Sequence, residues 1–303
     1  MSGPGFHMDA DDELLTDAVT RACAGAPDAA AAVDGLGCLV PIGEGLSLTD
    51  AALVVRTAAR CSLAYPLVEA LVLVALRGDG GRADDLRAAF GSGAADTPVA
   101  PVVEGTHHVL VLDEAATVVH RVSDHGAPRD PLQATGWHPR VEATIRHNAD
   151  LRAIALTLLA ARMSGTAEGL LARTIGHLSD RRQFGRPLGS FQALRHRAAQ
   201  DWIAVQDMQA ASDLAAVTWD TGDRAGALAL AQIAKATAAE AGPRVAENCI
   251  HVHGAMGFTW DAGLLPGLVS LRHDAVAVAD ARQLFAALGG GLISNQMQEG
   301  ATA

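Results

Sequence analysis

The first ninety residues show the spacing of apolar positions that is typical of amphipathic helices. Residues 9–34 open with acidic residues, which suit a helix N-terminus, and then place leucine, valine and alanine on one face. Two further apolar segments, 48–61 and 65–78, keep the same period, and Ser47 or Thr49 can cap the first of them. The pattern predicts a small helical unit at the start of the chain.

The middle of the chain has a different pattern. Three short segments, 97–105, 107–114 and 116–124, are rich in valine and are separated by glycine and acidic residues. Short runs of β-branched residues of this kind are typical of strands. They predict a small antiparallel sheet between about residues 97 and 146.

The helical period returns at about residue 148 and continues towards the end of the chain. It marks four segments, at 148–178, 189–221, 224–251 and 273–288. Long apolar helices joined by short connections favour an antiparallel four-helix bundle.

This order of elements predicts a mainly α-helical fold with a small β part. We expect a truncated N-terminal helical domain at 1–92, a reduced antiparallel β domain at 93–147 and a C-terminal four-helix bundle at 148–303. The bundle would carry the oligomer contacts, because its helices have apolar faces.

The composition narrows the classes of function. The chain has 303 residues, half of them hydrophobic, and a formal net charge of −11. An acidic surface argues against nucleic acids and anionic membranes as main partners, because both need basic protein surfaces. No run of 18 apolar residues lacks charge or glycine, so we expect no membrane span.

Cysteines and histidines are scattered along the chain. The four cysteines form no C-x-x-C pair and no secretion signal is evident, which indicates a reducing cytoplasm. Among the twelve histidines, H-V-H at 251–253 is a close pair with apolar neighbours, but it lacks the i, i+4 spacing of a helical metal site. We therefore expect no metal site.

One short stretch concentrates the positive charge. Residues 181–192 read RRQFGRPLGSFQ, with three arginines and a glutamine around a Phe-Gly turn. A guanidinium suits a phosphate group, because its fork donates paired hydrogen bonds to the oxygens. In isolation the motif has another interpretation, in which Arg181, Arg182 and Arg186 form a solvated helix end and Phe184 belongs to the core.

The surrounding residues resemble those of the acyl-CoA dehydrogenase family. That family has a signature between the first two bundle helices, and the matching segment here reads LLARTIGHLSDRRQFGRPLGSFQALRHRAAQDW. Its glycine turn after the third bundle helix is matched by ENCIHVHGAMGFTW, and its N-terminal loop and helix by GCLVPIGEGLSLTDAALVVRTAAR. The resemblance covers nearly the whole chain in order, and it implies FAD as cofactor and an acyl-CoA thioester as substrate.

The resemblance also implies roles for single residues. Arg181 matches the arginine that holds the flavin pyrophosphate of the adjacent subunit, and Phe184 and Gln192 match positions on the adenosine side. Gly254 and Gly257 would let the backbone approach the dinucleotide, because glycine has no Cβ. Together the two motifs favour cofactor binding over the solvated helix end.

The expected catalytic base is missing. Family members use a carboxylate to take the α-proton, and one matching position falls on Leu265 and the other near Ala155, which are both apolar. Asp261 is a weak candidate base in the turn, and a solvated turn residue is the alternative. Asp274 matches the aspartate of an R-D-A motif that is usually structural.

Two further departures concern the flavin. His251 stands where the family usually has glutamine, and it either donates a hydrogen bond to phosphate or ribose or is structural. The middle of the chain lacks the aromatic and hydroxyl pattern that holds the isoalloxazine, since the single tyrosine is Tyr65. The chain therefore resembles the non-catalytic subunit of an actinobacterial heteromeric acyl-CoA dehydrogenase.

This comparison leaves two hypotheses. In the first, the chain contributes FAD-binding residues in trans to a second acyl-CoA dehydrogenase-like chain, or to a second copy of itself, in lipid or sterol side-chain catabolism. In the second, the chain is a non-enzymatic structural homologue that binds no flavin and uses the bundle for oligomerisation.

Overall fold

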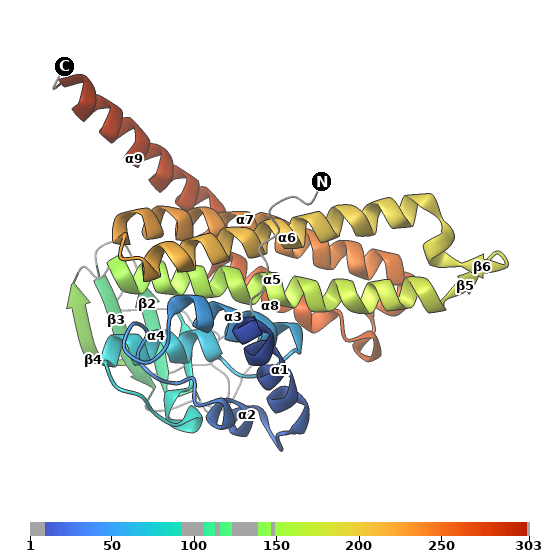
Figure 1. Cartoon of the computed structure of the whole chain (residues 1–303), viewed down its shortest axis with the longest axis horizontal. Coiled ribbons are helices and arrows are strands. Elements are labelled where there is room, and N and C mark those ends of the chain that lie inside the picture. The colour runs from blue at the N-terminus through green and yellow to red at the C-terminus, as the bar shows by residue number, and fades with distance from the viewer. Residues whose placement is uncertain (1–9, 92–105, 113–115, 123–138, 147–148, 302–303) are drawn as a thin grey trace.

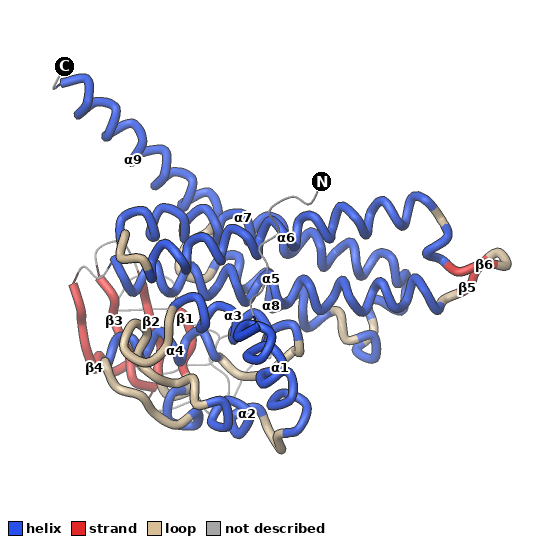
Figure 2. The backbone as a smooth tube through the Cα atoms, in the orientation of Figure 1, coloured by secondary structure: helices blue, strands red, loops and turns tan. Residues whose placement is uncertain are grey.

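The computed structural model describes residues 10–91, 106–112, 116–122, 139–146 and 149–301. Helices dominate this part of the chain, as the sequence pattern predicted (Figures 1 and 2). They are α1 (Ala10–Gly25), α2 (Ala29–Leu36), α3 (Leu48–Arg60), α4 (Leu67–Arg77), α5 (Ala149–Asp180), α6 (Gln192–Asp220), α7 (Arg224–His253), α8 (Leu265–Val276) and α9 (Ala281–Ala301). Short 3₁₀ segments are η1 (Ala83–Leu86), η2 (Leu188–Ser190), η3 (Gly254–Phe258) and η4 (Trp260–Ala262).

The first predicted helix is divided in two. The prediction of one helix at 9–34 is wrong, because α1 ends at Gly25 and α2 begins at Ala29. Pro27 cannot donate a backbone hydrogen bond within a helix, and Asp28 caps the new helix by accepting a bond of 2.8 Å from the Ala31 backbone N–H.

Helices α3 and α4 lie where the pattern predicted them. Of the two predicted caps for α3, Ser47 takes the N-cap position, and its hydroxyl accepts a 2.9 Å bond from the Asp50 backbone N–H. Helix α4 ends at Gly78, whose φ of 74° gives the left-handed C-cap that glycine adopts without strain.

The sheet is mixed. Its order is β1-β2-β3-β4, formed by Ala88–Phe90, His108–Leu112, Ala116–Val122 and Pro139–Arg146. The β2–β3 and β3–β4 pairs are antiparallel as predicted, but β1 pairs with β2 in parallel. Strand β1 has three residues, too few to show an alternating pattern in the sequence. The predicted strand at 97–105 lies outside the described residues.

Three long helices build the bundle. Helices α5, α6 and α7 run alongside one another, with α3 and α4 against α5 on one side (Figure 1). The prediction of a single last helix at 273–288 is wrong: α8 ends at Val276 and α9 begins at Ala281. Val278 between them has a φ of 66°, which no helix interior accommodates.

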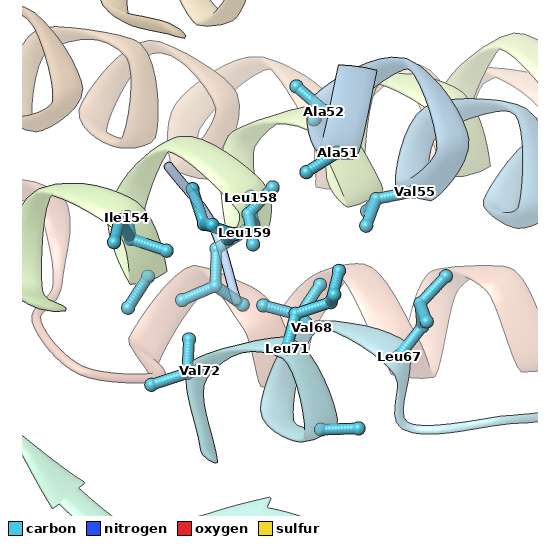
Figure 3. Close-up of a cluster of buried hydrophobic side chains, with 14 of the residues drawn as sticks. Ala51, Ala52, Val55, Leu67, Val68, Leu71, Val72, Ile154, Leu158 and Leu159 are labelled. Atoms are coloured by element: carbon cyan, nitrogen blue, oxygen red, sulfur yellow. The ribbon is translucent and has the colours of Figure 1, made fainter. Parts of the chain in front are cut away.

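Helix α5 is the apolar centre of the molecule. Its residues 150–180 are long and apolar enough to cross a membrane, but 78% of its most apolar window is buried inside the protein. Side chains of α3, α4 and α5 interlock there, including Val55, Leu71 and Leu158 (Figure 3). The apolar residues of α5 thus form part of the buried core of the protein.

Candidate functional site

The RRQFGRPLGSFQ segment forms a projecting hairpin at the far end of the bundle. Strands β5 (Arg182–Gln183) and β6 (Arg186–Pro187) pair between α5 and α6 (Figure 1). Phe184 and Gly185 form the turn with positive φ angles of 53° and 78°. The Phe184 side chain is 90% exposed, so the interpretation of Phe184 as a core residue is wrong.

Aromatic and cationic groups contact each other within this hairpin. The Phe184 and Phe191 rings meet edge to face with centroids 6.2 Å apart, and the Arg186 guanidinium lies 4.0 Å from the centre of the Phe191 ring. Arg181 and Arg182 are exposed at the end of α5, and Gln192 is exposed as the first residue of α6. Within the described ranges, none of these arginines forms an ion pair.

The second motif forms the turn after α7. Gly254 ends the helix with φ 63° and ψ −141°, a backbone conformation that residues other than glycine rarely adopt. Gly257 is buried, and a Cβ there would lie 2.4 Å from the Ile250 carbonyl oxygen. His251 is exposed in the last turn of α7. Both glycines are therefore required by the shape of the turn itself.

A pair of stacked histidines joins the two motifs. The rings of His177 on α5 and His253 on α7 lie 4.1 Å apart at an angle of 26°. The His177 carbonyl accepts the backbone N–H of Arg181, and His253 directly precedes Gly254. The stack thus brings the arginine hairpin and the glycine turn to the same end of the bundle. The sequence analysis missed this contact, since the two histidines are distant in the chain.

The stack also affects the charge of this end. Burial lowers the pKa of His177 first, and the neighbouring His253 and Arg181 lower it further, against the opposing effect of Asp180. His177 therefore stays neutral to a lower pH than a free histidine, which leaves the arginines as the main cations of the surface.

These residues fit one half of a dinucleotide site. Exposed guanidiniums without carboxylate partners in the described part can bind phosphate oxygens, and the exposed Phe184 ring offers an apolar face to a base or sugar. The groups lie on the outer surface of the bundle end rather than in a closed cavity. A dinucleotide held here would have to be covered by another chain.

No carboxylate occupies the positions that the family uses for the base. Ala155 is fully buried in α5, and Leu265 is the first residue of α8. Asp261 lies in the exposed segment η4, where it forms no ion pair with any described residue. Asp274 is buried and is engaged in a charge cluster.

That cluster links three helices and was not predicted. Arg162 on α5 donates two hydrogen bonds to Glu69 on α4, of 2.7 and 2.9 Å, and two to Asp274 on α8, of 2.9 and 2.7 Å. Burial alone would raise the pKa of Asp274, but the Arg162 guanidinium and His273 outweigh it and hold the pKa below its usual value. Asp274 is thus an ionised structural residue and not a proton acceptor at neutral pH.

A cavity of about 560 Å³ lies between α3, α5 and the start of α8. Apolar residues of α3 and of the segment 63–67 form much of its wall, Leu170 adds an apolar side chain from α5, and the segment 263–270 also lines it. Arg162, Arg173 and four hydroxyl residues also line it, but no aspartate or glutamate does. The cavity could bind an apolar group, and it supplies no base.

Comparison with known proteins identifies a family domain in the C-terminal half of the chain. Residues 156–272 match the model of the acyl-CoA dehydrogenase C-terminal domain. Acyl-CoA dehydrogenase IpdE2 of Mycolicibacterium smegmatis is 34% identical over 124 residues, 41% of this chain and 37% of that protein. Acyl-CoA dehydrogenase IpdE2 of Mycobacterium tuberculosis is 29% identical over 230 residues, 72% of this chain and 70% of that protein. The match thus covers 37% of the length of the first relative and 70% of the length of the second.

Solved structures share the fold along almost the whole chain. The ChsE4-ChsE5 complex from Mycobacterium tuberculosis matches with a TM-score of 0.70 at 18% identity, covering 95% of this chain and 99% of that chain. A variant of the Tcur3481-Tcur3483 steroid ACAD matches with a TM-score of 0.68 at 22% identity, covering 97% of this chain and 99% of that chain. The chain therefore carries the C-terminal domain of the acyl-CoA dehydrogenase family at residues 156–272 and has the fold of that family over nearly its whole length.

Proposed function

We propose that this chain is a subunit of an FAD-dependent acyl-CoA dehydrogenase that introduces an α,β double bond into an acyl-CoA thioester of lipid or sterol catabolism. It contributes cofactor-binding residues in trans, and a second acyl-CoA dehydrogenase-like chain supplies the catalytic base. The complex works in the cytoplasm, where the four free thiols would stay reduced.

One observation carries the proposal. Arg181 lies exposed beside the glycine turn, without a carboxylate partner in the described part of the chain. The surface around Arg181 is formed by two turns that depend on glycine. An arginine without a carboxylate partner at such a surface is suited to bind an anion of another molecule. The flavin pyrophosphate of a neighbouring subunit is the anion that the family resemblance implies.

Each nearby residue would have a separate task toward the cofactor. Arg181 would hold the pyrophosphate, Phe184 and Gln192 the adenosine side, and His251 a phosphate or ribose oxygen. Gly254 and Gly257 keep the turn close enough for backbone contact. FAD, when bound, supplies the acceptor for the hydride that leaves the β-carbon.

The partner is needed for the other half of the reaction. Removal of the α-proton requires a base, and Ala155 and Leu265 cannot accept one, while Asp274 is held by Arg162. Two of the solved structures that share the fold are described by pairs of names, ChsE4-ChsE5 and Tcur3481-Tcur3483, and the second is described as a steroid ACAD. These descriptions support a hetero-oligomer as the active form and a steroid-derived acyl group as one substrate class.

Replacement of Arg181 tests the proposal directly. In the complex co-purified with its partner, Arg181→Ala should weaken FAD binding by about tenfold or more, because a charged hydrogen-bond donor is lost. The readout is the ratio of flavin absorbance to protein after gel filtration, together with the FAD dissociation constant from fluorescence.

The matched control is Arg77→Ala, which removes another exposed arginine from the last turn of a helix, α4. It should leave flavin content unchanged. Full retention of FAD by Arg181→Ala would overturn the shared-site proposal. A complex without any flavin would favour the alternative of a non-enzymatic scaffold.

A further inference from the structure

The cavity between α3, α5 and α8 has the properties of a ligand site. Its volume of about 560 Å³ lies within the range of small-molecule sites in proteins. Val55, Ala58 and Leu67 on one side and Leu170 on the other give it an apolar wall. Val55 and Leu67 also belong to the cluster of buried apolar side chains drawn in Figure 3.

One arginine stands at its edge without an acidic partner. The Arg173 guanidinium donates to the Gly263 carbonyl oxygen over 3.0 Å and to the Ser62 hydroxyl over 3.2 Å. Within the described residues it forms no ion pair, in contrast to Arg56, Arg60 and Arg162, which all bind carboxylates from neighbouring helices. Arg173 is exposed at the mouth of the cavity, so its charge is solvated and stays available to an anion.

The backbone on both sides of Arg173 is arranged to hold it there. Gly263 has a φ of 65°, and a Cβ at this position would lie 2.7 Å from Arg173 Nη1. Ser62, on the other side, has a φ of 60°, which is uncommon for a residue other than glycine. Ser62 follows the C-terminus of α3, where the Leu63 backbone N–H donates to the Ala58 carbonyl oxygen over 3.0 Å. The turn that ends this helix therefore also presents the Ser62 hydroxyl to Arg173.

The rest of the lining sets the chemistry of the ligand. Arg162 is paired with the carboxylates of Glu69 and Asp274, so it offers no unpaired charge to a ligand. No aspartate or glutamate lines the cavity, so no carboxylate of the lining would compete with a ligand for Arg173. Ser270 lines the same cavity, and its hydroxyl has no hydrogen-bond partner among the described residues. An apolar volume next to an uncompensated guanidinium favours a ligand with an apolar body and an anionic end.

We infer that this cavity binds an apolar carboxylic acid, with the hydrocarbon body between α3, α5 and α8 and the carboxylate on Arg173. The site lies within this chain and does not depend on FAD or on a partner, so it stands apart from the dehydrogenase proposal. The acid could be a free molecule or the distal carboxylate of a dicarboxylic acyl thioester, since both present the same two groups.

Calorimetry and ligand-observed NMR on the purified chain test the site with decanoate as the probe and 1-decanol as its uncharged counterpart. Wild-type protein should bind decanoate about tenfold more tightly than 1-decanol, because the carboxylate gains a charged hydrogen bond. Arg173→Gln should remove that difference and leave the binding of 1-decanol unchanged. Arg282→Gln, an exposed arginine on α9, is the matched control and should change neither.

A second variant separates the cavity from the surface charge. Ala59 on α3 lines the cavity and is half-buried, so Ala59→Phe should fill it and abolish binding of both probes. Equal binding of decanoate and 1-decanol, or retention of decanoate by Arg173→Gln or Ala59→Phe, would overturn the inference, as would no binding to the wild type.

A competition experiment identifies the source of the acid. Displacement of decanoate by a dicarboxylic monoacyl-CoA would assign the site to the acyl group of a substrate. Displacement by free acids alone would assign it to a separate small molecule. Both results support the site, and neither depends on flavin content, so the site and the shared FAD can fail separately.

Discussion

At the scale of single residues, buried charged side chains gather around α8. Lys235 on α7 is fully buried, and its ammonium donates to the backbone carbonyls of Ala275 and Ala279, over 3.1 and 3.2 Å. These carbonyls flank the end of α8 and the strained Val278, where the last backbone acceptors of a helix have no partner of their own. Lys235 thus holds the break between α8 and α9 in place.

The protonation of Lys235 predicts a pH dependence of stability. Burial lowers its pKa from 10.5 to about 8, so between these values the unfolded chain binds a proton that the folded chain does not. Stability supplied through this group therefore rises with pH in that window. Relative to Lys235→Met, the wild type should gain about 2 kcal/mol of unfolding free energy between about pH 7 and pH 9.5.

Urea denaturation of both proteins across this pH range measures the difference. The comparison with Lys235→Met matters, because the thiols of the half-buried Cys23 and of the buried Cys38 and Cys249 have pKa values raised to about 11 and oppose the trend in both proteins. A constant difference between the two proteins would show that Lys235 keeps an ordinary pKa in the fold.

Contacts between charged residues that are distant in the chain could not be predicted from the sequence. The turn that carries Arg181 and Phe184 could be predicted from a local motif, because its residues are neighbours both in the chain and in space. Arg162 and Glu69 are 93 positions apart, and neither stands in a recognisable pattern. Their pairing follows from how α4 and α5 pack, which a single sequence does not reveal.

At the scale of elements, the same distinction holds. Helices α3, α5 and α7 were predicted close to their observed bounds, because their apolar period is long and uninterrupted. Strand β1 and the break between α8 and α9 were missed, since three residues and one positive φ at Val278 leave no periodic signal.

The contact between α3 and α5 depends on two glycines four residues apart. A Cβ on Gly165 would lie 2.0 Å from the Arg56 carbonyl oxygen, and one on Gly169 would lie 2.6 Å from that of Arg60. Two salt bridges, Arg56–Asp213 and Arg60–Glu168, surround this close approach. The absence of side chains lets the two backbones touch.

Substitution of Gly165 by alanine should therefore force α3 away from α5. We expect Gly165→Ala to lower the free energy of unfolding by about 1–3 kcal/mol, as overpacking does, measured by urea denaturation. Gly176→Ala on the same helix is the control, because nothing lies within 4 Å of its Cβ position. That control should be neutral or slightly stabilising, since alanine favours helix. Equal effects of the two changes would contradict the close-packing explanation.

At the scale of the whole molecule, the chain has the fold of an acyl-CoA dehydrogenase but an incomplete site. The hairpin and the glycine turn lie together at one end of the bundle, joined by the His177–His253 stack. The carboxylate that the reaction needs is absent from Ala155 and Leu265, and the cavity beside α8 contains no acid. A surface with exposed arginines and no base at these positions is consistent with the proposal that the chain works on a partner's flavin.

This division of labour predicts the flavin content of each species. The purified chain alone should show little or no absorbance of flavin in the visible range, because the residues proposed to bind the cofactor lie on an open surface. Co-purified with its dehydrogenase partner, the complex should contain fewer flavins than chains, since each flavin is shared across an interface. Absorbance spectra and mass measurements of both preparations give the ratio. A yellow preparation of the chain alone that oxidises an acyl-CoA would contradict the division, and Asp261→Asn would then be the variant that tests whether this chain carries its own base.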